Sequence, residues 1–259
     1  SLDGLGDLAG CRVLVRCDFN VPLADRRIVD DFRIRAAIRT LRELQEAGAH
    51  VTACSHLGRP GGQPDPNFGI EPIRQRLSEL LPGVAILENL RFDPGEINND
   101  PMLVERLVDG YDVYVNDAFG AAHRAHSSTV GVVPRVDDAA AGLLMAAELH
   151  HLGSLLAAPD RPFVALLGGS KVSGKLAVVE NLIGQVDTLL IGGAMAYTFF
   201  SARGYPTGLS LVEPDLLEAT RQIECSASER GVRLVLPTDH LVADRLKAGT
   251  RYDTIDVQD

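Results

Sequence analysis

A glycine-rich segment has the composition of a phosphate-binding turn. Residues 168–176 read GGSKVSGKL, after an apolar run and before a helical pattern. A turn of this kind can bind phosphate through its backbone N–H groups. Residues 169–175 nearly match the P-loop pattern, but Leu176 stands where that pattern needs Ser or Thr to hold Mg²⁺. The segment indicates either a phosphate site with Lys171 and Lys175 or a simple strand-to-helix turn with solvated lysines, and by itself it does not decide between them.

Four arginines form a second candidate site in a chain whose net charge is −10. The planar fork of arginine suits bidentate binding of carboxylate or phosphate. A single arginine is normally a surface residue, and a single histidine is normally structural. Three of these arginines, however, follow the ends of predicted strands, and the fourth opens a predicted helix, where a positive charge opposes the helix dipole. The residues concerned are Arg33, Arg59, Arg91 and Arg124, with His56, His123 and His126 near them in sequence.

Asp18, Phe19 and Asn20 follow the first predicted strand. Asp and Asn often end strands through side-chain turns, which is the simpler interpretation. The alternative is that their side chains hydrogen-bond to substrate hydroxyls.

Strand and helix patterns alternate along the chain, which favours a parallel α/β sheet with helices on both faces. Ligands of such sheets bind at the carboxyl ends of the strands, where the polar clusters of this chain also fall. The predicted strands are 13–15, 50–54, 84–87, 113–115, 163–167 and 188–191, and the predicted helices are 32–47, 70–81, 102–107, 139–156 and 175–182.

The sequence predicts two domains. Residues 157–162 (AAPDRP) interrupt the helix predicted over 139–156, and the strand–helix pattern then restarts. We therefore place a first domain at 1–158, including the helix 139–156 as a connector, and a second domain at 159–259.

Composition indicates an ordinary globular protein, since 46% of the residues are hydrophobic and 23% are charged. The acidic net charge argues against an unspecialised nucleic-acid binder. No apolar run approaches the ~20 residues of a membrane-spanning helix, and the first residues do not resemble a signal peptide. The four cysteines show no metal-binding spacing. Cys11, Cys17 and Cys54 lie in or beside apolar stretches, which favours reduced, buried thiols in a cytoplasmic protein.

Seven segments together resemble the phosphoglycerate kinase family, in family order and across most of the chain. They are 16–22 (RCDFNVP), 55–60 (SHLGRP), 88–92 (ENLRF), 115–120 (VNDAFG), 123–127 (HRAHS), 167–172 (LGGSKV) and 191–196 (IGGAMA). The resemblance implies two doubly wound, Rossmann-like domains facing a cleft. It also implies a glycolytic enzyme that transfers a phosphoryl group between 1,3-bisphosphoglycerate and ADP, giving 3-phosphoglycerate and ATP with Mg²⁺. A monomer is expected for the full-length form.

The resemblance also implies roles for individual residues. The first domain would bind the phosphoglycerate, and Arg33 would face the transferred phosphoryl group as a catalytic residue together with Lys171. Lys171 and Lys175 would meet the nucleotide phosphates, and Gly192 and Gly193 would let the backbone approach the nucleotide. The expected substrate-binding residues are Asp18, Phe19, Asn20, Arg33, His56, Leu57, Gly58, Arg59, Arg91 and Arg124.

The sequence departs from the family pattern in two places. The family has a further strand-and-helix stretch between Gly83 and Val84, and it continues beyond Asp259 with a nucleotide-binding Glu and a Mg²⁺-binding Gly-Gly-Asp turn. The second domain is thus expected to be incomplete, and no metal ligand is assigned. Two alternatives stay open: a phosphoglycerate-binding fragment without turnover, and a different ATP-using kinase built on residues 169–175, which would leave the arginines unexplained.

Overall fold

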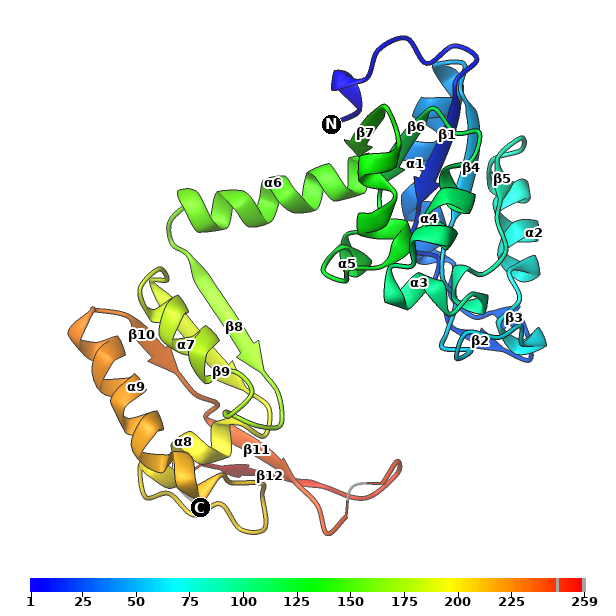
Figure 1. Cartoon of the computed structure of the whole chain (residues 1–259). Coiled ribbons are helices and arrows are strands. Elements are labelled where there is room, and N and C mark those ends of the chain that lie inside the picture. Colours follow the sequence, from blue (N-terminus) through cyan, green and yellow to red (C-terminus); the bar gives the residue numbers. More distant parts are fainter. Residues whose placement is uncertain (246, 258–259) are drawn as a thin grey trace. The chain divides into compact units, whose positions relative to one another are not determined.

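The computed structural model describes residues 1–245 and 247–257, and its contacts divide the chain into two compact units. Unit 1 is Ser1–Ser154 and unit 2 is Leu155–Asp259. The sequence places the boundary slightly later, at 158/159. Both units contain parallel sheets with helices, so the predicted α/β class is confirmed (Figure 1).

A five-stranded parallel sheet forms the centre of unit 1, in the order β5-β4-β1-β6-β7. Its strands are β1 (Arg12–Arg16), β4 (His50–Cys54), β5 (Ala85–Ile86), β6 (Val113–Asn116) and β7 (Asp138–Ala141). The helices are α1 (Phe32–Glu46), α2 (Glu71–Leu80), α3 (Gly95–Asn98), α4 (Pro101–Val108), α5 (Phe119–Ala122) and α6 (Leu143–Ala157), and a small hairpin pairs β2 (Leu23–Ala24) with β3 (Arg27–Ile28).

Alternate residues of β1 enter the hydrophobic clusters on the two faces of this sheet. Val13 and Val15 belong to the cluster that contains the apolar side chains of α1 and α2. Leu14 belongs to the opposite cluster, with Tyr114 and the apolar residues of α4. Because both faces are covered, the central residues of β1, 13–15, are all apolar, and its charged residues Arg12 and Arg16 stand at the two strand ends.

The connector helix begins later than the sequence predicts. Residues 138–141 form β7 and pair in parallel with β6, so the prediction of helix from residue 139 is wrong for its first turn. Pairing along a sheet edge outweighs the helix propensity of three alanines. Helix α6 starts only at Leu143, where Asp117 Oδ1 accepts hydrogen bonds from the N–H groups of Leu144 (2.8 Å) and Met145 (3.2 Å).

Unit 2 has its own sheet and core. Strands β8 (Val164–Gly168), β9 (Thr188–Gly192) and β10 (Arg233–Val235) are parallel, in the order β10-β9-β8. Helices α7 (Leu176–Ile183), α8 (Ala196–Ala202) and α9 (Leu217–Glu229) contribute side chains to one hydrophobic cluster. Strands β11 (Asp239–Val242) and β12 (Asp253–Asp256) form an antiparallel pair. Within the described residues, no helix is long and apolar enough to cross a membrane.

Candidate functional site

A polar cavity of about 310 Å³ lies at the carboxyl ends of the strands of unit 1. β1 is followed by Asp18 and Asn20, β4 by His56, Gly58 and Arg59, and β6 by Arg124, while Arg33 comes from the first turn of α1 and Arg91 from a 3-10 turn after β5. The cavity is lined by Asp18, Asn20, Arg33, His56, Gly58, Arg59, Arg91, Gly120, Ala121 and Arg124. The structure therefore brings eight of the residues chosen from the sequence into one place.

Backbone contacts fix the loop after β4 at the edge of this cavity. Asn20 Oδ1 accepts a hydrogen bond from the N–H of Gly58 at 2.9 Å, and the Gly58 carbonyl accepts one from Arg91 Nη1 at 2.7 Å. Gly58 has φ +61°, and a Cβ there would lie 2.3 Å from the Phe68 ring. Only glycine fits, because a side chain would be both strained and in collision with the ring.

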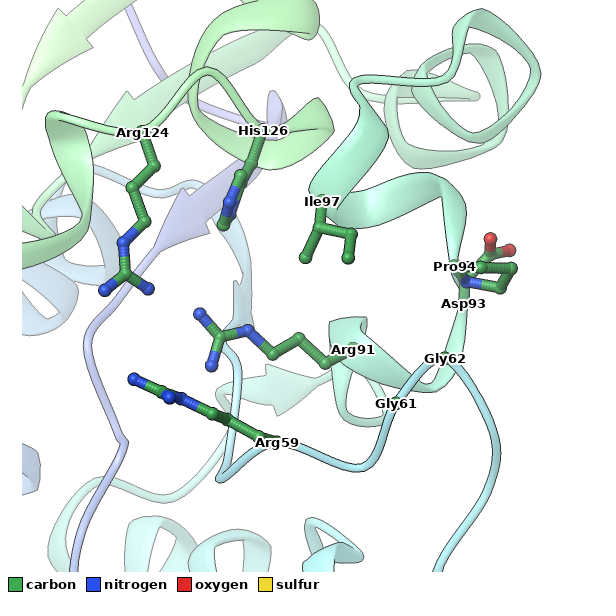
Figure 2. A pocket seen from close by; sticks show the side chains of 9 residues that line it. All are labelled: Arg59, Gly61, Gly62, Arg91, Asp93, Pro94, Ile97, Arg124 and His126. Atoms are coloured by element: carbon green, nitrogen blue, oxygen red, sulfur yellow. The ribbon is translucent and has the colours of Figure 1, made fainter.

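Three guanidinium groups converge beside the cavity. Figure 2 shows Arg59, Arg91 and Arg124 turned toward one another from three separate segments, at one side of an adjoining cavity of about 460 Å³. Arg91 is buried, and its Nε has no hydrogen-bond partner. Burial lowers the pKa of Arg91, and the positive charges of Arg124 and Arg16 lower it further. An anion placed among these groups would relieve their repulsion and supply the missing acceptor.

Arg33 and Asp18 form an ion pair at the cavity wall. The Arg33 side chain remains 50% exposed and that of Asp18 22% exposed. Because an exposed ion pair contributes little free energy, the guanidinium of Arg33 can leave Asp18 and bind another anion with little loss of stability.

His56 is a neutral side chain at the wall of the cavity. Its Nδ1 lies 3.0 Å from Nη2 of Arg16. Burial, followed by the charges of Arg16 and Arg91, lowers the pKa of His56 to about 3. His56 can therefore offer a hydrogen bond at neutral pH, but not a positive charge.

Phe19 and Leu57 belong to the hydrophobic core and do not line the cavity. Their side chains are 0% and 2% exposed and lie in the cluster under α1 and α2. Their backbones hold the strand ends in place instead. The N–H of Phe19 donates to Ser55 Oγ at 2.8 Å, and the N–H of Leu57 donates to Asn89 Oδ1 at 3.0 Å.

In unit 2, a carboxylate from the same unit occupies part of the glycine-rich turn. Glu213 Oε2 accepts hydrogen bonds from the N–H groups of Val172 (2.5 Å) and Ser173 (3.1 Å), and Oε1 accepts one from Ser173 Oγ at 2.6 Å. These bonds, with that of the Ser173 hydroxyl foremost, lower the pKa of Glu213. Two N–H groups that a P-loop would use are thus already engaged. Lys171 is exposed and Lys175 is half-buried at the start of α7.

The two glycines predicted to approach a nucleotide differ in their surroundings. Gly193 has φ +68°, and a Cβ on it would lie 2.9 Å from the backbone N and O of Gly169. This glycine is required by the close approach of two turns within unit 2. A Cβ on Gly192 would meet nothing within 4 Å, so the packing of the chain itself does not demand glycine there.

No group of three or more His, Cys, Asp or Glu side chains among residues 1–245 and 247–257 is arranged to hold a metal ion.

Several residues around the cavity carried no usable signal in the sequence. Ala121 contributes mainly small size, and Glu96 and Ser128 lie behind the cavity without belonging to a recognisable pattern. Gly120 ends the family segment 115–120, but that segment did not mark it as a site residue. Glu213 is distant in sequence from the turn that it holds. Arg16 did carry a signal, because it is a charged residue at the end of an apolar strand.

Comparison with families and curated proteins gives a consistent result. The family model "Phosphoglycerate kinase" matches residues 2–86 and 82–259. A phosphoglycerate kinase of Rubrobacter xylanophilus is 48% identical over 276 residues, which cover 98% of this chain and 69% of that protein. One from Chloroflexus aurantiacus is 48% identical over 280 residues, covering 98% and 70%. The family match divides at 82–86, next to the short turn where the sequence departs from the family pattern.

Solved structures show the same similarity. A phosphoglycerate kinase from Coxiella burnetii matches with a TM-score of 0.87 and 37% identity, over 99% of this chain and 70% of that one. One from Pyrococcus horikoshii matches with a TM-score of 0.78 and 30% identity, over 97% and 69%.

Proposed function

The chain belongs to the phosphoglycerate kinase family, and from this we propose that it takes part in reversible phosphoryl transfer between 1,3-bisphosphoglycerate and ADP, giving 3-phosphoglycerate and ATP. The observation that carries the proposal is the convergence of Arg59, Arg91 and Arg124 in an acidic chain. Together with the unpartnered Nε of Arg91, it supports a site for a phosphorylated, anionic substrate.

We propose that the cavity of unit 1 binds the phosphoglycerate. The phosphate would lie among the three arginines, with His56 as a neutral donor, and Asp18 and Asn20 would hydrogen-bond to the hydroxyl region. Arg33 would bind the phosphoryl group during transfer. Phe19, Leu57 and Gly58 would act through the backbone, by holding these side chains in position.

The chemistry of the reaction suits these residue types. The leaving group of an acyl phosphate is a carboxylate, so the reaction needs alignment and cations on the phosphoryl oxygens more than a strong general base. In the proposed assignment, Lys171 and Lys175 of unit 2 provide cations for the nucleotide phosphates, with Gly192 and Gly193 beside them. The family uses Mg²⁺ with the nucleotide to neutralise phosphate charge.

We propose a cytoplasmic protein that is monomeric in its full-length form, which fits the buried thiols Cys17 and Cys54 and the family assignment. Size-exclusion chromatography with light scattering tests the monomeric state.

Calorimetry with 3-phosphoglycerate, together with a coupled ATP assay, tests the proposed function. Arg91→Gln should weaken 3-phosphoglycerate binding by tenfold or more, on the order of the 1.5–3 kcal/mol of a hydrogen bond to a charged group. Arg42→Gln removes the same charge from an exposed position of α1 and is the matched control. Equal binding by the two variants would refute the assigned site. Binding without turnover would favour the second candidate, a phosphoglycerate-binding protein without catalysis.

A further inference from the structure

A chain of buried hydrogen bonds runs behind the wall of the unit 1 cavity. Glu96 in α3 is 0% exposed, Ser128 is 1% exposed and Arg16 at the end of β1 is 1% exposed. Ser128 Oγ donates to Glu96 Oε1 at 2.6 Å, and Arg16 Nε donates to Ser128 Oγ at 2.8 Å. The Ser128 N–H also donates to Glu96 Oε2 at 3.1 Å. Arg16 ends the chain by donating from Nη2 to His56 Nδ1 at 3.0 Å.

In this series of hydrogen bonds, the chemical nature of each side chain determines which group donates and which accepts. The serine hydroxyl has one proton, which goes to the carboxylate, so its oxygen is left to accept from Arg16. A guanidinium can only donate, so His56 Nδ1 must accept and cannot carry a proton. In a neutral imidazole the proton then lies on Nε2.

His56 stays neutral because burial and several positive charges oppose its protonation. Arg16, Arg91 and Arg124 lower its pKa, and Asp18 is the charge that opposes them. The imidazole is 5% exposed and still forms part of the cavity wall. Its remaining polar atom is the Nε2–H, a donor suited to an anionic oxygen.

Arg16 needs this support because a buried guanidinium is costly without hydrogen bonds and a compensating charge. Its Nη1 donates to the carbonyl of Cys17, its Nε to Ser128 and its Nη2 to His56. The carboxylate of Glu96 lies one hydroxyl away, so it compensates the charge and holds Ser128 in the accepting orientation.

We propose that Glu96 is a positioning residue that acts through Ser128 and Arg16 to hold His56 as the Nε2–H tautomer, a neutral hydrogen-bond donor to the anionic substrate. The role of the tautomer in substrate binding rests on the proposed function, whereas the tautomer itself does not. Arg16 is likewise a positioning residue, because it is buried and does not line the cavity.

Nitrogen NMR of the ¹⁵N-histidine-labelled chain at neutral pH tests the tautomer directly, since protonated and unprotonated ring nitrogens resonate far apart. We expect a proton on Nε2 of His56 and none on Nδ1, before any ligand is added. A proton on Nδ1, or a charged imidazole, would overturn the proposal whatever the variants do.

Two variants test whether the hydrogen bonds that link Glu96 to His56 determine the tautomer of His56. Ser128→Ala removes the link between Glu96 and Arg16, and Glu96→Gln keeps the size of the side chain but removes its charge. We expect both to shift His56 toward a mixture of tautomers and to weaken 3-phosphoglycerate binding by about tenfold, the value of one hydrogen bond to a charged group. Glu105→Gln, which removes a 59% exposed carboxylate of the same unit, is the charge control and should change neither.

The outcomes separate this proposal from the proposed function. If the parent chain binds 3-phosphoglycerate but folded Ser128→Ala and Glu96→Gln keep the parent tautomer, the positioning role is wrong and the proposed function stands. If the tautomer shifts as expected but the parent chain does not bind 3-phosphoglycerate, the positioning role stands and the proposed function fails. Because Glu96→Gln is nearly isosteric, it serves as the folded variant if Ser128→Ala does not fold.

Discussion

At the scale of single residues, Arg33 is a half-exposed cavity arginine that forms an ion pair with the carboxylate of Asp18. A side chain that can leave a weak ion pair is suited to a charge that develops only during transfer. We expect Arg33→Ala to lower kcat by about 10²-fold or more, with a smaller effect on 3-phosphoglycerate binding. Arg35→Ala, also exposed on α1 and paired with Asp31, is the control for lost charge. A normal kcat with only a raised KM would contradict the role.

The arginine cluster depends on the shape of the side chain as well as on its charge. Arg59→Lys and Arg124→Lys should each weaken 3-phosphoglycerate binding about tenfold, because an ammonium cannot replace a planar fork. Calorimetry at rising ionic strength should also show weaker binding by the parent, since the exposed part of the site is screened. Arg39→Lys, on an exposed position of α1, should bind like the parent. Parental binding by both cluster variants would remove these arginines from the site.

At this scale, the position of a residue relative to a predicted strand was the information that indicated which side chains would lie together. Asp18, Arg59 and Arg124 could be chosen because polar residues in the segments that follow parallel strands share one edge of the sheet. Glu96 and Ser128 could not be found in this way, because an ion pair bridged by a hydroxyl depends on side-chain geometry between distant segments. The side chains of Phe19 and Leu57 lie in the core, which their motif does not reveal, because a motif does not show which of its members point away from a cavity.

At the scale of elements, α6 depends on its amino-terminal cap. Asp117 Oδ1 holds the first N–H groups of the helix, while Oδ2 is buried without a partner. Asp117→Ala should therefore be less stable than Asp117→Asn by about 1 kcal/mol, the usual value of a cap, because asparagine can still accept those hydrogen bonds. Urea unfolding of the two variants measures the difference, and equal stability would show that the cap contributes nothing.

Asp117 should also make the stability of the folded chain depend on pH, and the direction of this dependence follows from its pKa. Burial raises the pKa of Asp117 above its ordinary value of 3.8. The folded state therefore holds the proton more tightly than the unfolded state, and the contribution of Asp117 to stability is greatest at low pH. It declines as the pH rises through the raised pKa. Asp117→Asn should gain stability relative to the parent between pH 4 and pH 7, and a constant difference would contradict this account.

Glu213, which holds the glycine-rich turn of unit 2, should contribute to stability with a pH dependence opposite to that of Asp117. The pKa of Glu213 lies below its ordinary value of 4.5, so its contribution to stability is present above that value and is lost as the pH falls through the lowered pKa. Glu213→Gln should lower the unfolding midpoint of unit 2 at pH 7 and lose this effect in stronger acid. Glu218→Gln, an exposed carboxylate on α9, is the control. An effect that persists below pH 3 would assign the change to packing.

Element boundaries were harder to predict than element types. Residues 138–141 have a helical composition, yet they form the edge strand β7, because a neighbouring strand offers them hydrogen-bond partners. The glycine-rich turn was located correctly between β8 and α7. That a carboxylate forty residues away would occupy it could not be read from its own sequence.

At the scale of the whole molecule, the apolar clusters divide between the two units. The clusters around β1 belong to unit 1, and the cluster around α8 and α9 belongs to unit 2. Separate cores favour separate unfolding transitions. We expect 3-phosphoglycerate at about 100 times its Kd to stabilise unit 1 by about 2.7 kcal/mol and to leave the transition of unit 2 unchanged. Hydrogen exchange with and without 3-phosphoglycerate measures the stabilisation of each unit separately. An equal gain in protection by unit 1 and unit 2 would contradict the prediction.

The rate at which the buried cysteines of unit 1 react with a reagent in solution reports how fast unit 1 opens. Cys17 and Cys54 are fully buried beside the ends of β1 and β4, and burial raises the pKa of Cys54 to about 12. Cys225 is exposed on α9 of unit 2. A thiol-reactive dye should therefore label the exposed Cys225 and the partly buried Cys11 in the folded chain, and reach Cys17 and Cys54 only as fast as the sheet of unit 1 opens. The rate of the slow labelling phase, followed by mass spectrometry, then measures how fast unit 1 opens, without any substitution in the chain.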